Sequence, residues 1–399
     1  MFKKLINKID FFVSERNFFY NVFNLIFLLC LSFYLFRSFC QFGSLLHIYT
    51  DVTLYWIMYY FLIFICLYKM FVMFIDKNFF LFFFSILIIF VFYISYYLHP
   101  THRNIFESAL FIISCYKIGY RKIIFCFVFS IGTIIFSETI LSLCGIIQDL
   151  IYINSKGEYR HSFGGVYPTD YAASILFLCF GVWLLINKAS TFFSIAILSL
   201  LIYFQFKFTI TRNTEIVMIF AIMSLCIYEF LNKFNIQSKS ILLLGIFSFV
   251  FFTILMVSLS FLYSKFNCIL KLNEFLSGRL ELSYNSFIKN GIYIFGNEIQ
   301  MVGFGNGNGE SGEYNFLDIS YILILIKYGV ASYAIYFFMY VILYIRAMIA
   351  TNVKLLFVLI LVTIHSTVEH HYIDICYNFS LLLLFSNLYC TRKLDNLSD

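Results

Sequence analysis

The chain repeats long, nearly continuous apolar stretches that are separated by short polar connections. A helix needs about 20 apolar residues to cross a hydrocarbon core of ~30 Å. Runs of that length include Phe18–Phe36, Phe79–Leu98, Ile123–Ile147 and Ile241–Leu262. A transmembrane β-barrel would show short alternating strands instead. The pattern therefore predicts an all-α polytopic integral membrane protein.

Hydropathy divides the chain into about twelve transmembrane helices within a single membrane domain, residues 1–399. The first run lies too far from the start and is too long for a cleaved signal peptide, so we predict it as the first span. No internal repeat of the kind found in many secondary transporters is visible. The spans are expected over 18–36, 53–75, 79–98, 104–119, 122–147, 170–187, 190–206, 214–231, 240–262, 318–345, 354–371 and 373–390.

Lysine and arginine are distributed unevenly between the two sets of connections. With the N-terminus inside, the inner connections hold fifteen lysines and arginines and the short outer connections hold six. Inner loops of membrane proteins carry the excess of positive charge. We therefore predict a multi-pass protein of the bacterial cytoplasmic membrane with both termini in the cytoplasm.

The composition agrees with this class and excludes others. Charged residues make up 12% of the chain, whereas a soluble domain has about 25%. The eleven cysteines form no C-x-x-C pair and no zinc spacing, so we interpret them as small apolar residues. No basic stripe with interleaved polar aromatics indicates nucleic acid as a partner.

Two outer connections are long enough to carry function, namely 148–169 and 263–317. The second begins with helical spacing and then becomes rich in glycine, which predicts a small extracytoplasmic helical cap followed by a mobile segment. GFGNGNGESGEY lacks the G-x-x-x-x-G-K-[ST] pattern of a phosphate loop. The connection 263–317 holds eight of the eighteen glycines of the chain: Gly278, Gly291, Gly296, Gly303, Gly305, Gly307, Gly309 and Gly312.

Three arginines fall in separate outer connections, at Arg160, Arg212 and Arg279. Arginine suits bidentate contacts to phosphate, and helix N-termini add free N–H groups. We predict that the three converge on a diphosphate, with His161 and Tyr167 beside Arg160 as candidate substrate contacts. The alternative is that each arginine marks a membrane edge or pairs with a lipid headgroup.

Asp318 and Ser320 open an apolar helix directly after the glycine-rich segment. A carboxylate at this boundary can take a proton from an attacking hydroxyl. It can equally serve as a helix N-cap. Both interpretations remain open at this point, with Ser320 as a further candidate substrate contact.

A cluster of ionisable residues lies in HSTVEHHYIDICYNF, at the outer end of a span. His365 and Glu369 are four residues apart and are expected to share a helical face. Together with His370 they are candidate substrate contacts or members of a proton relay. The spacing is not H-E-x-x-H and no second carboxylate cluster pairs with it, so we expect neither a metal nor another cofactor. Asn378, within the last predicted span, is expected to make an interhelical hydrogen bond, which is a structural role.

The order and spacing of these segments resemble those of the O-antigen and capsular or exopolysaccharide repeat-unit polymerases (Wzy-type), relatives of the O-antigen ligases. The resemblance covers the organisation of nearly the whole chain. Its local carriers are RHSFGGVYPTDYAA, TITRNTEI, SGRLELSYNSF followed by GNEIQMVGFGNG, LDISYILILIKYGV and VEHHYIDICYNF.

The resemblance implies a metal-independent glycosyltransferase that acts on undecaprenyl-diphosphate oligosaccharides at the outer face of the membrane. The growing glycan would move to the non-reducing end of an incoming unit, and the diphosphate carrier would leave. Arg160, Arg212 and Arg279 would bind the diphosphate. The ligases commonly have a histidine where this chain has Asp318, which favours a polymerase with Asp318 as the base. A chain-length regulator and a flippase of the same pathway are the partners implied.

Two other function classes remain open. A lipid-linked oligosaccharide flippase or transporter would also need arginines for the diphosphate, but it would need polar residues reachable from both faces. The polar residues of this chain are concentrated on the predicted outer side. A ligase-like glycan transferase is the second alternative.

Overall fold

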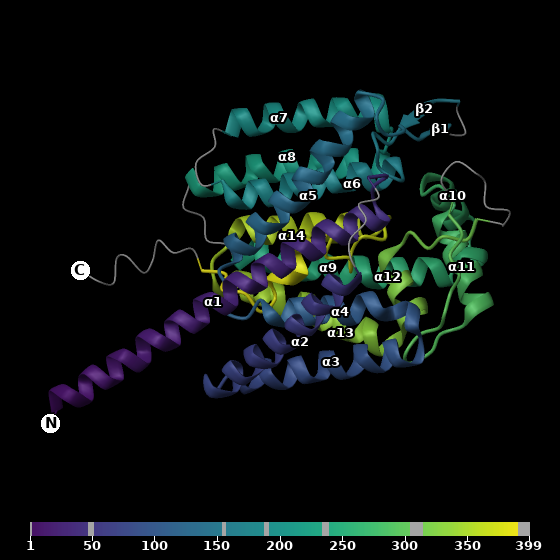
Figure 1. Ribbon diagram of the computed structural model, residues 1–399. Helices are drawn as coiled ribbons and strands as arrows, with labels where there is room; N and C mark the ends of the chain where they lie inside the picture. The colour runs from purple at the N-terminus through teal and green to yellow at the C-terminus, as the bar shows by residue number, and fades with distance from the viewer. Residues whose placement is uncertain are drawn as a thin grey trace.

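The computed structural model describes residues 2–46, 52–153, 157–186, 191–233, 239–303 and 314–389, with side chains for most of them from Asn21 onward. Helices of different lengths form one bundle (Figure 1). The helices are α1 (Phe2–Phe42), α2 (Val52–Ile75), α3 (Phe79–Leu98), α4 (Arg103–Ser114), α5 (Tyr120–Leu143), α6 (Pro168–Leu185), α7 (Thr191–Phe204), α8 (Arg212–Lys233), α9 (Lys239–Phe261), α10 (Asn267–Phe275), α11 (Arg279–Asn290), α12 (Ser320–Leu323), α13 (Gly329–Ile349) and α14 (Val353–His365).

Eight stretches of helix in the described residues are long and apolar enough to cross a membrane. They lie in α1, α2, α3, α5, α6, α8, α9 and the run from α12 through α13. The chain is therefore a multi-pass helical membrane protein. The predicted number of twelve spans is not reached by these helices alone, because α4, α7 and α14 are shorter and residues 373–389 form no α-helix.

The last predicted span, 373–390, is wrong as a helix over its described part. Residues 373–389 form turns and one short 3-10 helix, η5 (Phe379–Leu383), and Leu381–Leu384 are fully buried. The connection between α4 and α5 forms hydrogen bonds with the backbone of this segment. Asn387 N donates to Ile118 O at 2.8 Å, and Tyr120 N donates to Asn387 O at 3.0 Å. An apolar run cannot distinguish a span from a buried irregular segment, and such a segment is tolerated inside protein.

The helix predicted over 354–371 ends early, at His365. The next two hydroxyls bond back to the last turn, with Ser366 Oγ donating to Val362 O and Thr367 Oγ1 donating to Ile364 O, both at 2.7 Å. Such bonds compete with continuation of the helix. Glu369 therefore lies beyond the helix, and the prediction that it shares a helical face with His365 is wrong.

The two long connections contain structure of their own. Residues 148–169 include an antiparallel hairpin, β1 (Ile151–Ile153) and β2 (Tyr159–His161), which the sequence did not predict. Residues 263–317 begin with a short 3-10 helix, η3 (Tyr263–Lys265), which is followed by α10 and α11, where helical spacing predicted a cap. The glycine-rich stretch at 304–313 lies outside the described residues. The hairpin, α10 and α11 gather at one end of the bundle, which we call the hairpin end (Figure 1).

α14 lies at the centre of a group of helices in the bundle. It contacts α6, α8, α9 and α13, and most of its residues are fully buried. A helix that is apolar all round is expected to be surrounded by protein. Just beyond it, Asn378 Nδ2 donates to the Tyr340 hydroxyl of α13 at 2.6 Å and to Tyr372 O at 2.7 Å. Asn378 thus makes a structural hydrogen bond to α13, but from an irregular segment and not between two helices as predicted.

A close contact between two glycines attaches the long connection to the bundle. The π-helical turn η4 (Ile324–Tyr328) ends at Gly329, with φ of +89°, and packs on Gly296, with φ of +87°. A Cβ on Gly296 would lie 2.0 Å from Lys327 O. Asn297 N donates to that same carbonyl at 3.0 Å. No other residue type fits this contact without moving the backbone.

We predict that Gly296→Ala lowers the thermal transition of the detergent-purified protein by more than Gly278→Ala does. Both positions have positive φ, so both variants carry the left-handed strain of about 1–2 kcal/mol. A Cβ on Gly278 would meet nothing within 4 Å, so that variant lacks the added clash. Equal transitions in the two variants would contradict the close contact.

Candidate functional site

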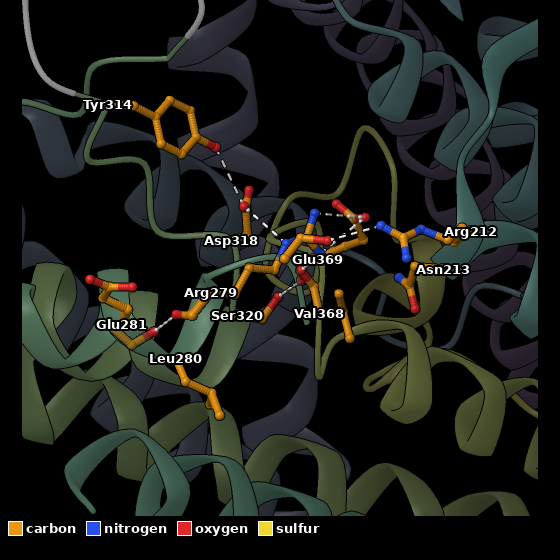
Figure 2. Close-up of polar contacts among 12 residues, drawn as sticks. Arg212, Asn213, Arg279, Leu280, Glu281, Tyr314, Asp318, Ser320, Val368 and Glu369 are labelled. Carbon is orange, nitrogen blue, oxygen red and sulfur yellow. Dashed lines mark hydrogen bonds and ion pairs between the residues drawn. The ribbon is translucent and has the colours of Figure 1, made fainter. Parts of the chain in front are cut away.

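The guanidinium of Arg279 lies between two carboxylates at the hairpin end (Figure 2). Arg279 Nε is 3.1 Å from Asp318 Oδ2, and Nη1 is 3.3 Å from Glu369 Oε1. Nη1 also donates to the carbonyl of Val368. The three side chains are between 5% and 16% exposed, so the pairing is largely shielded from water.

Local geometry of the α10–α11 connection sets the position of Arg279. Ser277 and Gly278 both adopt positive φ, at +57° and +83°. The Asn273 side chain then accepts from Leu280 N at 3.0 Å and from Glu281 N at 3.2 Å, which caps the start of α11. Arg279 is consequently held at the first position of a capped helix that faces the bundle.

Asp318 is not the N-cap of the helix that follows. α12 begins at Ser320 with Ile319 at the cap position, and the Asp318 carboxylate instead meets Arg279 and, at 3.5 Å, the hydroxyl of Tyr314. Burial raises the pKa of the Asp318 carboxyl, and the Glu369 carboxylate adds to this, while Arg279 opposes it. The structure thus excludes the capping interpretation and leaves a buried acid with a raised pKa.

Glu369 comes from the segment beyond α14, and Ser320 fastens that segment to α12. Ser320 Oγ donates to the carbonyl of Glu369, and Tyr372 N donates to Ser320 Oγ at 3.4 Å. Ser320 N donates in turn to Ser366 O at 3.3 Å. The hydroxyl of Ser320 donates to one backbone group and accepts from another, which indicates a structural role beside the site.

Arg160 approaches the same region from the hairpin. It lies on β2 opposite Tyr152, and its Nε donates to Thr209 O at 3.0 Å. Thr209 is the last residue of the π-helical turn η2 (Gln205–Thr209), and Ile210 follows in the left-handed conformation. Arg160 therefore satisfies a carbonyl at the end of this turn.

The charges around Arg160 show which groups are its neighbours. Burial lowers the pKa of its guanidinium, Glu369 and Glu215 raise that pKa, and Arg279 and Arg212 lower it. For Arg279 burial alone would lower the pKa, but the Glu369 and Asp318 carboxylates raise it above its ordinary value. Arg160 and Arg279 thus share Glu369 as a neighbour.

Arg212 completes the group from the first turn of α8. Its Nη2 donates to Ser277 Oγ at 3.3 Å, two residues before Arg279. The adjacent Asn213 Nδ2 donates to His365 O at 3.5 Å, which joins α8 to the end of α14. The structure brings the three arginines together, as predicted. Their binding of a diphosphate stays a prediction.

A second cluster lies next to Glu369 and contains three histidines. The rings of His365 and His371 are 5.9 Å apart and those of His370 and His371 are 4.1 Å apart. His371 Nε2 is 3.4 Å from Asp170 Oδ1, in the first turn of α6. Burial lowers the pKa of His370 to about 4 and that of His371 well below its ordinary value.

Sequence reasoning missed Asp170 as a member of this cluster. Asp170 and His371 are 201 residues apart in the chain, so no spacing rule connects them. The available signal was an acidic residue in the first turn of a helix that directly follows the Arg160 segment.

His161 and Tyr167 lie beside the site and are engaged elsewhere. His161 Nδ1 is 2.6 Å from Asp149 Oδ2, and Asp149 also accepts from Phe163 N at 2.8 Å. The Tyr167 ring packs 5.5 Å from that of Tyr152, and a Cβ on Gly303 would meet the Tyr167 hydroxyl at 2.9 Å. Both residues organise the hairpin, and Tyr167 contacts the long connection.

Comparison of the chain with protein-family models, with curated proteins and with solved structures gave no match. The interpretation of the site therefore depends on its geometry.

We predict that Arg279→Ala destabilises the protein by about 3–5 kcal/mol, because it leaves two buried carboxylates without their cation. Adding Glu369→Gln should recover part of the loss, since one of the stranded charges is then removed. Chemical unfolding in mixed micelles measures both variants, with the exposed Lys271→Ala on α10 as a control that changes little. Strictly additive effects of Arg279→Ala and Glu369→Gln would contradict the direct pairing.

Proposed function

We propose that the protein is a polysaccharide polymerase that joins lipid-linked oligosaccharide repeat units. The observation that supports this most is the grouping of Arg160, Arg212 and Arg279, from three separate connections, around buried carboxylates at one end of a membrane bundle. Arginine is suited to diphosphate, and a membrane bundle suits a polyprenyl tail. We place the hairpin end on the outer face and both termini in the cytoplasm.

We also propose that the chain crosses the membrane twelve times. Besides the eight long helices, α4, α7 together with η2, α14 and the buried segment 373–389 would each cross once more. An irregular segment can cross where protein surrounds it, and residues Leu381–Leu384 are fully buried.

In the proposed reaction, a hydroxyl at the non-reducing end of the incoming unit attacks the anomeric carbon of the donor glycan. The new C–O bond forms while the bond to the diphosphate breaks, and its electron pair leaves on the diphosphate oxygen. The arginines stabilise that negative charge. The hydroxyl proton passes to the Asp318 carboxylate.

Substrate binding and base activation are coupled in this scheme. A diphosphate that engages Arg279 competes with Asp318 and Glu369 for the same guanidinium. When the diphosphate takes over Arg279, the Asp318 carboxylate is released to accept a proton. The exchange of Asp318 for diphosphate as the ionic partner of Arg279 would thereby free the base only when the donor is bound.

The test uses purified protein in lipid nanodiscs with the producing strain's own undecaprenyl-diphosphate repeat unit, without nucleotide sugar or an ion gradient. We expect a glycan ladder on a gel from the wild type and from Lys265→Ala, which removes an exposed cation at the same end. Arg160→Ala should lose the ladder, because it removes one of the three guanidinium groups.

Other outcomes separate the rival functions. Lipid crossing the bilayer without a ladder would overturn the polymerase and indicate a flippase. Transfer of a single preformed glycan to a different acceptor would indicate a ligase-like transferase.

A pH profile tests the role of Asp318. The base must be ionised, so the rate should rise with pH through the raised pKa of Asp318 and then level off. We expect Asp318→Asn to lower the rate by ~10²–10⁴-fold, the usual effect of losing a general base, while Asp318→Glu retains the rising limb. An unchanged rate and profile in a well-folded Asp318→Asn variant would exclude Asp318 as the base.

A further inference from the structure

Three side chains from two distant segments point donor atoms at one another beside the arginine site. One ligating atom from each of Asp170, His370 and His371 lies within 4.8 Å of the other two. Asp170 comes from the first turn of α6, and the two histidines come from the turn after α14. The ring centroids of the two histidines are 4.1 Å apart.

The histidines of this cluster have polar atoms with no assigned role. His371 is 0% exposed, and neither of its ring nitrogens has a hydrogen-bond partner among the described residues. Nδ1 of His370 is likewise buried and unbonded. A buried polar group without a partner is costly, and these nitrogens are available to bind a ligand.

The separation of the donors fits coordination better than a direct hydrogen bond. His371 Nε2 and Asp170 Oδ1 are 3.4 Å apart, yet they do not meet the geometry of a hydrogen bond. Two ligands about 2.0–2.1 Å from a tetrahedral zinc ion lie roughly 3.3–3.4 Å apart. A metal ion between the two atoms would occupy this gap.

We propose that Asp170, His370 and His371 bind a divalent transition metal ion, with zinc the first expectation. Two imidazoles and one carboxylate form a donor set that zinc and ferrous iron both accept. Three protein ligands leave at least one coordination position open. This inference is independent of the proposed polymerase activity, and it replaces the expectation from sequence that no metal is bound.

A neighbouring set of donors competes less well for the ion. Asp318, Glu369 and His370 also bring ligating atoms within 4.8 Å of one another. Both of these carboxylates are paired with Arg279, at 3.1 and 3.3 Å. A cation placed there would have to displace or repel the guanidinium, so the ion belongs on the Asp170 side of His370.

The test is metal analysis by inductively coupled plasma mass spectrometry on full-length protein without a polyhistidine tag. We expect about one zinc or iron ion per chain in the wild type, the content of a structural or catalytic mononuclear site. His371→Gln and Asp170→Asn should each lose most of it. His161→Gln should retain it, since His161 lies at the same end but pairs with Asp149.

The outcomes are distinct from those of the activity test because no turnover is measured. Equal metal in the wild type and in both ligand variants would show an adventitious ion and overturn the site. A metal-free wild type after reconstitution with zinc and dialysis would do the same.

X-ray absorption at the metal edge is measured on the wild type, so it does not depend on whether the variants fold. It should show two imidazole ligands and further N/O ligands at about 2.0–2.1 Å. A spectrum without imidazole scattering would also overturn the proposal.

Discussion

The ion pairs of Arg279 join three parts of the chain that are far apart in sequence. Asp318 precedes α12, Glu369 follows α14, and Arg279 begins α11. Charges this deeply buried are tolerated only when they are paired, and removing one partner costs much more than the pair contributes. The start of α11, the residue before α12 and the turn after α14 therefore meet at this one guanidinium.

Most groups of the site lie at the ends of helices or in the connections between them. Arg160 lies on a short hairpin and bonds the end of the π-helical turn η2, and Arg279 follows two residues with positive φ. Rigid apolar helices below position these irregular segments, and the segments present the polar atoms. Within the described residues, the charged groups of the site therefore come from helix ends and connections rather than from helix interiors.

The class of fold could be predicted from sequence because the membrane imposes length and apolarity on each helix. The grouping of Arg160, Arg212 and Arg279 could be predicted too, since the topology predicted from lysine and arginine placed all three connections on one side. The irregular form of residues 373–389 could not, because buried helices and buried turns use the same apolar residues. The end of α14 depends on two hydroxyls, at Ser366 and Thr367, whose bonding a hydropathy profile does not register.

The contact between Asp170 and His371 was beyond sequence reasoning for a different reason. It depends on how α6 and the turn after α14 are packed, which no local pattern encodes. The same holds for the pairing of Asp318, where a carboxylate before a helix has the position of a cap but turns toward Arg279. Local rules describe what a residue can do, and tertiary packing decides which partner it finds.

The proposed polymerase depends above all on the binding of a lipid-linked diphosphate by the arginines at the hairpin end. The most direct measurement is a cryo-electron microscopy structure of the protein in nanodiscs with undecaprenyl diphosphate added. We expect density for the phosphates within hydrogen-bond distance of Arg160, Arg212 and Arg279, with the Arg279–Asp318 pair opened. Phosphate density at the opposite end of the bundle, or an unchanged ion pair with the lipid bound elsewhere, would contradict this binding.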